Sequence, residues 1–300
     1  MTNKSAQLAL AASRRGHARL QTIDGELTKY WFYPAKTTAA KTIIFIHGYR
    51  GNHRGLEAIA GALEDFEIFI PDLPGFGASA PLNGEHSIAH YSQWLDKFIQ
   101  GLNLSAKPIL LGHSFGTIVC SHFAATNPRS ISKLVLVNPV SAPALEGPKA
   151  GLTKIAMLFF WLAAKLPVTT ADWLLKSWPM VRGMSIVMTK SKDKTLRAWV
   201  HRQHDDNFND FAELRVAIEG YHASISSCVA DFAASFEMPT MFIAGDRDDI
   251  TSVAQQQKTF AKVKASESRL EVIHSVGHLT HYETPERVAD LIRSFAGGSK

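Results

Sequence analysis

The sequence predicts an α/β fold in which a mostly parallel sheet of eight strands is covered by helices on both faces. Two observations carry this prediction: a hairpin near the N-terminus, and six short apolar runs that alternate with helical segments. Continuous apolar runs are typical of strands buried on both faces, and helical crossovers join such strands in parallel. The six runs are residues 42–46, 67–70, 108–111, 134–137, 240–244 and 270–273.

The hairpin is expected within residues 19–32, which read RLQTIDGELTKYWF. Two β-prone segments flank Asp24-Gly25, and this dipeptide suits the positive φ angles of a tight turn. The sheet should therefore begin with an antiparallel pair. Helices are expected in residues 56–63, 88–102, 115–125, 253–260 and 285–295, with Ser87 and Thr284 as N-caps of the second and the last.

Residues 141–237 lie between two of the predicted strands and contain no clear strand of their own. Helical-looking segments rich in aromatic side chains fill this interval, and structureless loops of such a length are rare in compact proteins. We therefore predict a core domain formed by residues 1–140 and 238–300, and a helical subdomain formed by residues 141–237.

The composition excludes several other classes of protein. Hydrophobic residues make up 46% and charged residues 20% of the 300 residues, which is typical of a globular chain and excludes disorder. The net charge of +5 is spread along the chain without a basic block, so no nucleic-acid partner is expected. Cys120 and Cys228 lie far apart, which gives a disulfide scaffold or a zinc site no support and favours the reducing cytoplasm.

The sequence predicts neither a signal peptide nor a membrane-spanning segment. The apolar patch at residues 7–12 precedes Arg14 and Arg15, which is the reverse of the charge order in a signal peptide. The longest apolar run, residues 155–164, is well short of the roughly 20 residues that cross a bilayer.

A serine stands between two glycines in the pentapeptide Gly112-His113-Ser114-Phe115-Gly116. A predicted strand runs into this pentapeptide and a helical segment runs out of it. In such a setting the serine occupies a sharp, strained turn, and the residues two positions away must be small for the chain to cross itself. The turn would hold the serine hydroxyl where the amides of the next helix can stabilise negative charge. The alternative is a glycine-rich turn with an incidental serine.

A serine nucleophile needs a base, and the base needs an acid that orients it. His278 follows the last predicted strand, and a loop with Asp246, Asp248 and Asp249 follows the strand before it. Groups that bind ligands in open α/β sheets gather beyond the carboxyl ends of the strands, so all three loops can face one crevice. The pattern predicts Ser114 as nucleophile, His278 as base and one of the three aspartates as its partner.

From about residue 19 to residue 295 the chain resembles the α/β-hydrolase fold family. Five motifs agree with the family in order: IHGY at residues 46–49, PDLPGFGAS at 71–79, the serine turn, GDRD at 245–248, and GH at 277–278 followed by ETPE at 283–286. The resemblance implies an eight-stranded, mostly parallel α/β-hydrolase sheet with a helical cap inserted at residues 141–237.

The resemblance also assigns roles to single residues. It implies Ser114 as nucleophile, His278 as general base and Asp248 as the acid, because the family pattern has an aspartate three positions after the glycine. Asp246 and Asp249 stay open as alternatives for the acid.

The backbone amides of Tyr49 and Phe115 would form the oxyanion hole that the resemblance implies. His47 resembles a structural histidine beside that loop, and His113 is expected to pack near the site and to contact substrate. No metal and no organic cofactor is required by this chemistry.

Two further features have a simpler structural interpretation. His201, His204, Asp205 and Asp206, in the stretch HRQHDD, lack further ligands at a recognisable spacing, so we expect a solvated helix face rather than a metal site. Asp72 is expected to fix its turn by hydrogen bonds.

The aromatic segment 157–161 has two interpretations, a helix at a membrane surface or the inner face of a cap over the active site. Its polar face lacks the strongly basic character of an interfacial helix, which favours the cap. Phe159 and Trp161 are then expected to bind an apolar part of the substrate.

The sequence therefore predicts a serine hydrolase that cleaves a carboxylic ester, a thioester or a lactone in a small molecule with an apolar part. A hydrolase of carbon–carbon bonds could use the same three residues, and a non-catalytic ligand receptor could keep the same fold. The serine argues against epoxide hydrolases and dehalogenases, whose families carry an aspartate at this position. The sequence makes no prediction of oligomeric state.

Overall fold

The computed structural model describes residues 3–38, 40–146 and 150–297. Its centre is an eight-stranded sheet with the order β1-β2-β4-β3-β5-β6-β7-β8. β2 pairs antiparallel with β1 and with β4, and all other neighbours are parallel. The strands are β1 (His17–Ile23), β2 (Glu26–Tyr33), β3 (Thr42–Ile46), β4 (Glu67–Pro71), β5 (Ile109–His113), β6 (Lys133–Val137), β7 (Thr240–Gly245) and β8 (Arg269–Ile273).

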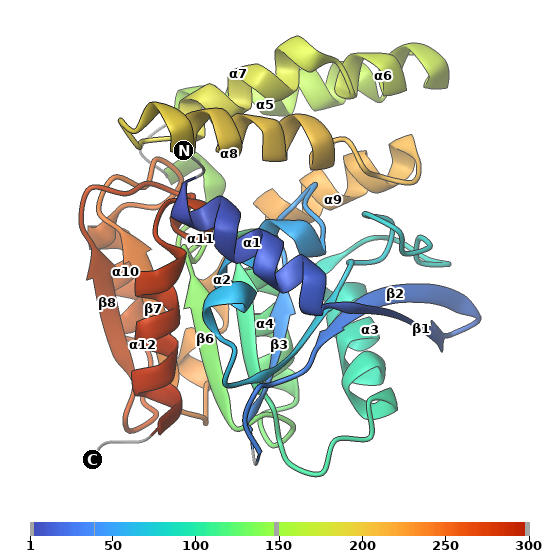
Figure 1. The fold of residues 1–300 in the computed structure, drawn as a ribbon. Coiled ribbons are helices and arrows are strands. Elements are labelled where there is room, and N and C mark those ends of the chain that lie inside the picture. The colour runs from blue at the N-terminus through green and yellow to red at the C-terminus, as the bar shows by residue number, and fades with distance from the viewer. Residues whose placement is uncertain (1–2, 39, 147–149, 298–300) are drawn as a thin grey trace.

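Helices cover both faces of this sheet (Figure 1). They are α1 (Lys4–Arg15), α2 (Glu57–Ala62), α3 (Ile88–Gly101), α4 (Phe115–Thr126), α5 (Ala150–Ala163), α6 (Val168–Leu175), α7 (Trp178–Met188), α8 (Lys194–Asn207), α9 (Leu214–Ser226), α10 (Val253–Phe260), α11 (Thr280–Glu283) and α12 (Pro285–Gly297). The α/β class, the antiparallel start and the parallel remainder are confirmed. None of the helices described combines the length and the apolar character that a membrane crossing demands.

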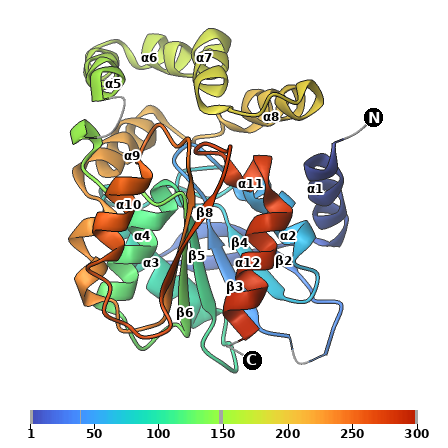
Figure 2. The same cartoon turned by 90° about the vertical axis from the view of Figure 1, so that its left-hand side faces the viewer.

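The apolar strands are buried on both faces, as the sequence pattern predicts. In β3, Ile44 and Ile46 belong to the hydrophobic cluster that includes α3 and α4, whereas Ile43 and Phe45 belong to the cluster that includes α2 and α12. Figure 2 shows α3 and α4 on one side of the sheet and α2 and α12 on the other. Alternating side chains therefore fill two cores, one on each face of the sheet.

Local signals in the sequence explain where several elements begin and end. Asp24 and Gly25 take φ angles of 53° and 88° at the turn between β1 and β2. Ser87 caps α3, because its side chain accepts a hydrogen bond from the amide of His90. Both features agree with the predicted hairpin and the predicted N-cap.

Helix α1 is not among the helices that the sequence predicts, although residues 7–12 form an apolar patch in it. It lies against α2, where a Cβ added at Gly61 would come within 2.0 Å of the Leu8 carbonyl oxygen. Only glycine permits this approach of two backbones. Arg15 also donates a hydrogen bond to the Ala60 carbonyl at 2.7 Å.

The turn after β4 is held by Asp72, as expected. One carboxylate oxygen accepts from the amide of His53 at 2.7 Å and the other from the amide of Ala78 at 2.9 Å. A Cβ at Gly77, where φ is 56°, would lie 2.2 Å from the Asp72 carboxylate. The turn therefore needs both a buried carboxylate and a glycine.

Between β6 and β7 the chain forms helices α5 to α9, and Figure 1 shows them as a layer beyond one edge of the sheet. The division into a core domain (1–140 and 238–300) and a cap subdomain (141–237) stays a prediction. Cys120 and Cys228 are both buried and free.

Candidate active site

Ser114 lies on the sharp turn between β5 and α4, with φ 52° and ψ −120°. A positive φ is uncommon for a residue other than glycine, and strain of this kind gathers at functional sites. A Cβ at Gly112 would lie 2.5 Å from the Gly116 carbonyl oxygen, and a Cβ at Gly116 would lie 2.3 Å from that of Ile46. The two glycines are therefore required for the chain to cross itself at the serine.

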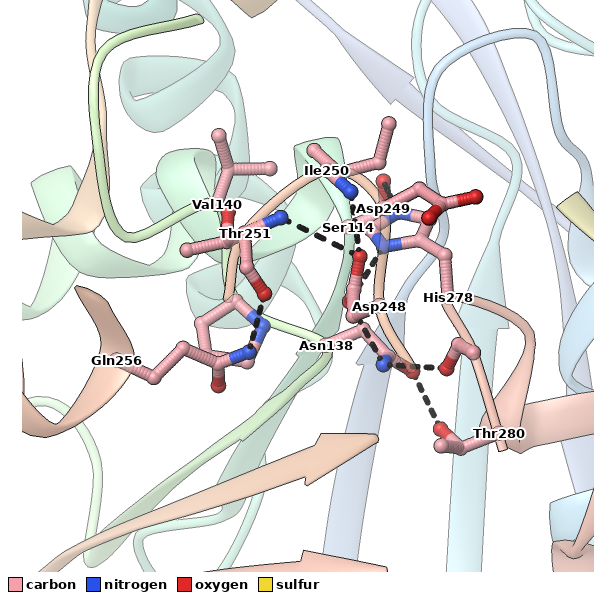
Figure 3. Close-up of polar contacts among 12 residues, drawn as sticks. Ser114, Asn138, Val140, Asp248, Asp249, Ile250, Thr251, Gln256, His278 and Thr280 are labelled. Carbon is pink, nitrogen blue, oxygen red and sulfur yellow. Dashed lines mark hydrogen bonds and ion pairs between the residues drawn. The ribbon is translucent and has the colours of Figure 1, made fainter. Parts of the chain in front are cut away.

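His278 joins Ser114 to an aspartate. Its Nε2 atom lies 2.7 Å from Ser114 Oγ, and its Nδ1 atom lies 2.8 Å from an Asp248 carboxylate oxygen. Ser114 follows β5, Asp248 follows β7 and His278 follows β8, so the chain beyond the carboxyl ends of three strands meets at one point (Figure 3). Nδ1 donates to the carboxylate, which leaves Nε2 as the acceptor for the serine proton.

The structure also separates the three candidate acids. Asp246 lies beside His274, with its carboxylate 3.1 Å from Nδ1, and Asp249 forms an ion pair with Lys190. Asp248 is the aspartate whose carboxylate is hydrogen-bonded to His278 Nδ1. The backbone amide of Ile250 donates to its other oxygen at 2.8 Å.

Burial alone would raise the pKa of the Asp248 carboxyl group. The adjacent imidazole of His278 and the donors around the carboxylate outweigh this effect, so the pKa of Asp248 lies below its ordinary value. The carboxylate is therefore ionised at neutral pH, as an orienting acid must be.

Asn138, which the sequence analysis missed, positions this carboxylate. It follows β6, and its side-chain amide donates to Asp248 at 3.0 Å and to the Gly277 carbonyl at 3.1 Å, while its own oxygen accepts from the Thr280 hydroxyl. Its φ of 47° lies in the left-handed region, which asparagine tolerates better than most residues. The only signal in the sequence was an asparagine directly after an apolar strand.

Tyr49 and Phe115 line the same cavity as Ser114. Phe115 is the first residue of α4, where a helix leaves its amides without intrahelical acceptors. Within residues 3–38, 40–146 and 150–297, neither backbone amide has a hydrogen-bond acceptor. Two amide donors are thus free beside the serine, and their use for an oxyanion stays a prediction.

His47 ties the loop before Tyr49 to the turn after β4. Its Nδ1 donates to the Gly48 carbonyl at 2.8 Å, and its Nε2 accepts from the amide of Leu73 at 2.8 Å. Burial lowers the pKa of His47, so the ring is neutral. These contacts support the structural role expected for it.

Two neutral histidines surround His278. The His113 ring lies 3.9 Å from that of His281, and its Nε2 atom lies 3.2 Å from the His278 carbonyl oxygen. Burial, followed by the charge of His278, lowers the pKa of His113 to about 3, and burial lowers the pKa of His281 well below its usual value. Neither ring carries a positive charge that would repel a protonated His278. His113 lines the cavity, and its contact with substrate stays a prediction.

A cavity of about 600 Å³ lies in front of Ser114, a size typical of small-molecule sites. Its walls come from the loops after the strands and, in the inserted segment, from helices α5, α7, α8 and α9. Most of the lining is apolar, with contributions from Leu56, Val140, Ile155, Phe159, Phe160, Met180, Met184, Val187 and Met188. The site is therefore suited to an apolar group placed beside the serine.

The prediction that Trp161 lines this cavity is wrong. Phe159 does line it, but Trp161 is 53% exposed and its ring contacts Lys165 at 4.3 Å. Successive residues of an α-helix are rotated by about 100°, so two positions apart they lie on nearly opposite faces. Phe159 faces inward and Trp161 outward on the same helix.

The prediction that the stretch HRQHDD forms a solvated helix face is also wrong in part. His201 and His204 are buried, and the Nδ1 atoms of both lie within 2.7 Å of the Ser185 hydroxyl. Asp206 is exposed, and Asp205 pairs with Arg182 on α7. The two histidines join α8 to α7, and among the described residues no group of His, Cys, Asp or Glu is placed to hold a metal ion.

Arg50, which the sequence analysis also missed, ties the loop after β3 to the inserted helices. It is only 1% exposed and takes a φ of 59°. Its guanidinium donates to the carbonyls of Phe208 at 3.0 Å and Leu175 at 2.8 Å, and to the Asn209 side chain at 2.7 Å. A buried cation thus holds three acceptors of the inserted segment next to Tyr49.

We expect the substitution Arg50→Met to lower the free energy of unfolding by about 3 kcal/mol. Methionine keeps much of the apolar length but leaves buried carbonyls without donors, at roughly 1–3 kcal/mol each. Urea unfolding followed by circular dichroism measures the change. Arg54→Met, at an exposed position of the same loop, is the matched control and should change stability little. Equal midpoints for the two variants would contradict the prediction.

Comparison with known proteins agrees with this architecture. A family model described as the alpha/beta hydrolase fold matches residues 41–285. The chain belongs to the α/β-hydrolase fold family.

Two sequence relatives and two solved structures illustrate the similarity. Lipase 1 of Psychrobacter immobilis is 24% identical over 272 residues, which cover 86% of this chain and 77% of the lipase. A Mycoplasma genitalium protein that its name assigns to the esterases and lipases is 32% identical over 123 residues, 41% of this chain, and the match spans about half of it (45%). The enol-lactonase of Burkholderia xenovorans has a TM-score of 0.76 at 15% identity, covering 93% of this chain and all (100%) of the lactonase. A carboxylesterase of Bacillus subtilis has a TM-score of 0.72 at 15% identity, covering 99% of both chains.

Proposed function

We propose that this protein is a serine hydrolase that cleaves a carboxylic ester, a thioester or a lactone through an acyl-enzyme on Ser114. One observation carries the proposal: the hydrogen-bonded series from Asp248 through His278 to the Ser114 hydroxyl, which opens on an apolar cavity. The names of the sequence relatives, which include lipases, support an ester as the bond that is cleaved.

In the proposed reaction, His278 Nε2 takes the proton of Ser114 as Oγ attacks the carbonyl carbon of the substrate. The amides of Tyr49 and Phe115 donate to the oxyanion that forms. Protonated His278 then gives its proton to the leaving oxygen of an ester or lactone, or to the leaving sulfur of a thioester, and the bond from the acyl carbon to that atom breaks. Water, deprotonated by His278, attacks the acyl carbon; the bond to Ser114 Oγ then breaks, His278 returns the proton to Oγ, and the acid is released. Asp248 stays ionised, holds Nδ1–H and stabilises the imidazolium.

The proposed substrate carries a substantial apolar group, which the cavity would hold. We propose that helices α5 to α9 act as a cap, since residues of four of them line the cavity beside the serine. Apolar walls limit the access of water to the reacting carbonyl, which strengthens the electrostatic contacts around it.

A fluorophosphonate probe tests the proposal. The probe should react with the native protein, with loss of fluoride, and mass spectrometry should locate the adduct on Ser114. The same preparation should hydrolyse p-nitrophenyl esters, and urea-unfolded protein should do neither. Absence of labelling together with absence of hydrolysis at every chain length would favour a ligand receptor. Turnover of a diketone substrate without ester turnover would favour the carbon–carbon bond hydrolase.

We expect Phe159→Ala to lower kcat/KM for p-nitrophenyl octanoate about tenfold and to leave p-nitrophenyl acetate unchanged. The phenyl ring lines the cavity, and burying a large apolar side chain contributes about 1.5–3 kcal/mol. Trp161→Ala, two positions along the same helix but outside the cavity, is the matched control and should leave both substrates unchanged. A flat profile of rate against acyl length in the wild type and in both variants would contradict an apolar acyl site.

A further inference from the structure

Large apolar side chains are exposed in unusual concentration on one part of the surface. Among the described residues, eleven of the sixteen exposed large hydrophobic side chains lie within residues 155–187. They are Ile155, Met157, Leu158, Trp161, Leu162, Leu166, Val168, Trp173, Trp178, Ile186 and Val187, and we call them the outer helical face. Figures 1 and 2 show α5, α6 and α7 as the layer farthest from the sheet. Extended apolar surfaces of this kind mark interaction sites.

The outer helical face is continuous with the active-site cavity. Ile155 and Val187 are 65% and 42% exposed, and both also line the cavity that contains Ser114. An apolar molecule that rests on the outer helical face therefore meets apolar side chains from the surface to the serine.

The segment that carries this face, residues 150–190, has more basic than acidic residues. Within residues 150–190 the acidic residue is Asp172, whereas the basic residues are Lys154, Lys165, Lys176, Arg182 and Lys190. The last three pair with Asp172, Asp205 and Asp249 respectively. Lys154, in the first half of α5, and Lys165, just after the end of that helix, are both exposed. Their charges complement a surface of phosphate groups.

The aromatic residues on this face have the character of membrane-interface side chains. Trp161, Trp173 and Trp178 are 53%, 71% and 60% exposed, and Lys165 lies over the Trp161 ring. Tryptophan combines an apolar ring with a polar N–H and is favoured where one end is apolar and the other wet. Lysine can bury its methylene stem and keep its charge among headgroups.

We propose that the outer helical face docks this protein on the surface of an anionic phospholipid bilayer, with the tryptophans at the level of the headgroups. The segment 157–161 alone lacks a strongly basic face, but α5, α6 and α7 together supply the apolar area, and Lys154 and Lys165 supply positive charge. A second copy of the chain fits this face less well, because a symmetric contact brings like charges of Lys154 and Lys165 together. Docking goes beyond the proposed hydrolysis and does not require it.

Vesicle flotation with the full-length protein tests the proposal. We expect binding to vesicles of phosphatidylcholine with phosphatidylglycerol, much weaker binding to phosphatidylcholine alone, and loss of binding at high salt. Lys154→Gln with Lys165→Gln should weaken binding about 25-fold, since each lysine near an anionic surface contributes about 1 kcal/mol. Trp173→Gln with Trp178→Gln should weaken it by about tenfold or more. Leu20→Gln, at a 62% exposed position on β1, is the matched control and should bind as the wild type does.

The Ser114→Ala protein separates this proposal from the proposed function. It should bind vesicles as the wild type does. A protein without hydrolytic activity could therefore still support the docking proposal, and a protein that does not bind vesicles could still support the proposed hydrolysis. Thermal melts of all variants exclude misfolding as the cause of lost binding. Equal flotation of wild type and both double variants would overturn the proposal. A dimer in sedimentation velocity that the tryptophan variants abolish, without vesicle binding, would overturn it in favour of self-association.

Discussion

Replacement of His278 by alanine is expected to lower kcat for ester hydrolysis by about a millionfold, with little change in KM. His278 contacts both Ser114 and Asp248, and its loss removes the acceptor for the serine proton and the donor for the leaving group. In serine hydrolases whose triad acts as a unit, removal of the histidine costs roughly this factor. Steady-state kinetics with a p-nitrophenyl ester, combined with fluorophosphonate labelling, measure the loss.

His274→Ala is the matched control for this substitution. His274 lies on the same loop, has a side chain that is 84% exposed and pairs with Asp246 rather than with the serine. We expect wild-type kinetics for this variant. A His278→Ala enzyme with wild-type kcat would contradict the proposed mechanism, whatever the behaviour of the control.

The substitution Asp248→Asn is expected to lower kcat by about 10⁴-fold while the protein stays folded. An asparagine at this position can present its amide group to His278 Nδ1, which moves the ring proton to Nε2 and leaves no acceptor for the serine proton. A factor of this size follows when the orienting aspartate of a serine hydrolase becomes asparagine. The rate should be measured with the same p-nitrophenyl ester.

Asp246→Asn distinguishes among the acids that the sequence left open. Its carboxylate accepts from the amide of Ser275 at 2.7 Å and lies beside His274, away from His278. We expect a change in kcat of less than about twofold, as for a surface group away from the reacting atoms. Loss of activity in this variant, with Asp248→Asn active, would reverse the assignment.

Features that depend on local rules could be predicted from the sequence. The turn at Asp24-Gly25, the strands buried on both faces and the glycines around Ser114 all follow from constraints that act within a few residues. The order of serine, aspartate loop and histidine also placed Ser114 and His278 beyond the strand ends, because parallel strands bring those ends to one edge. The class of fold and two members of the candidate triad were therefore accessible before any coordinates.

Other features depend on contacts between distant segments. Arg50 is held by carbonyls of residues 175 and 208, and Asn138 bonds to Asp248, 110 positions away along the chain. The residue type at a loop position does not indicate which distant residue it will contact. The burial of His201 and His204 was missed for the same reason, since Ser185 lies on another helix.

The sequence by itself determined the sheet, the strained turn at Ser114 and the residue types of a proton relay, because backbone sterics and apolar periodicity are local properties. Only the tertiary structure decided that Asp248 rather than Asp246 or Asp249 meets His278, and that Phe159 faces the cavity while Trp161 faces outward. The reason is geometric. The direction in which a side chain points depends on how its helix or loop packs against segments far away in the chain, and the residue type at a single position does not encode that packing.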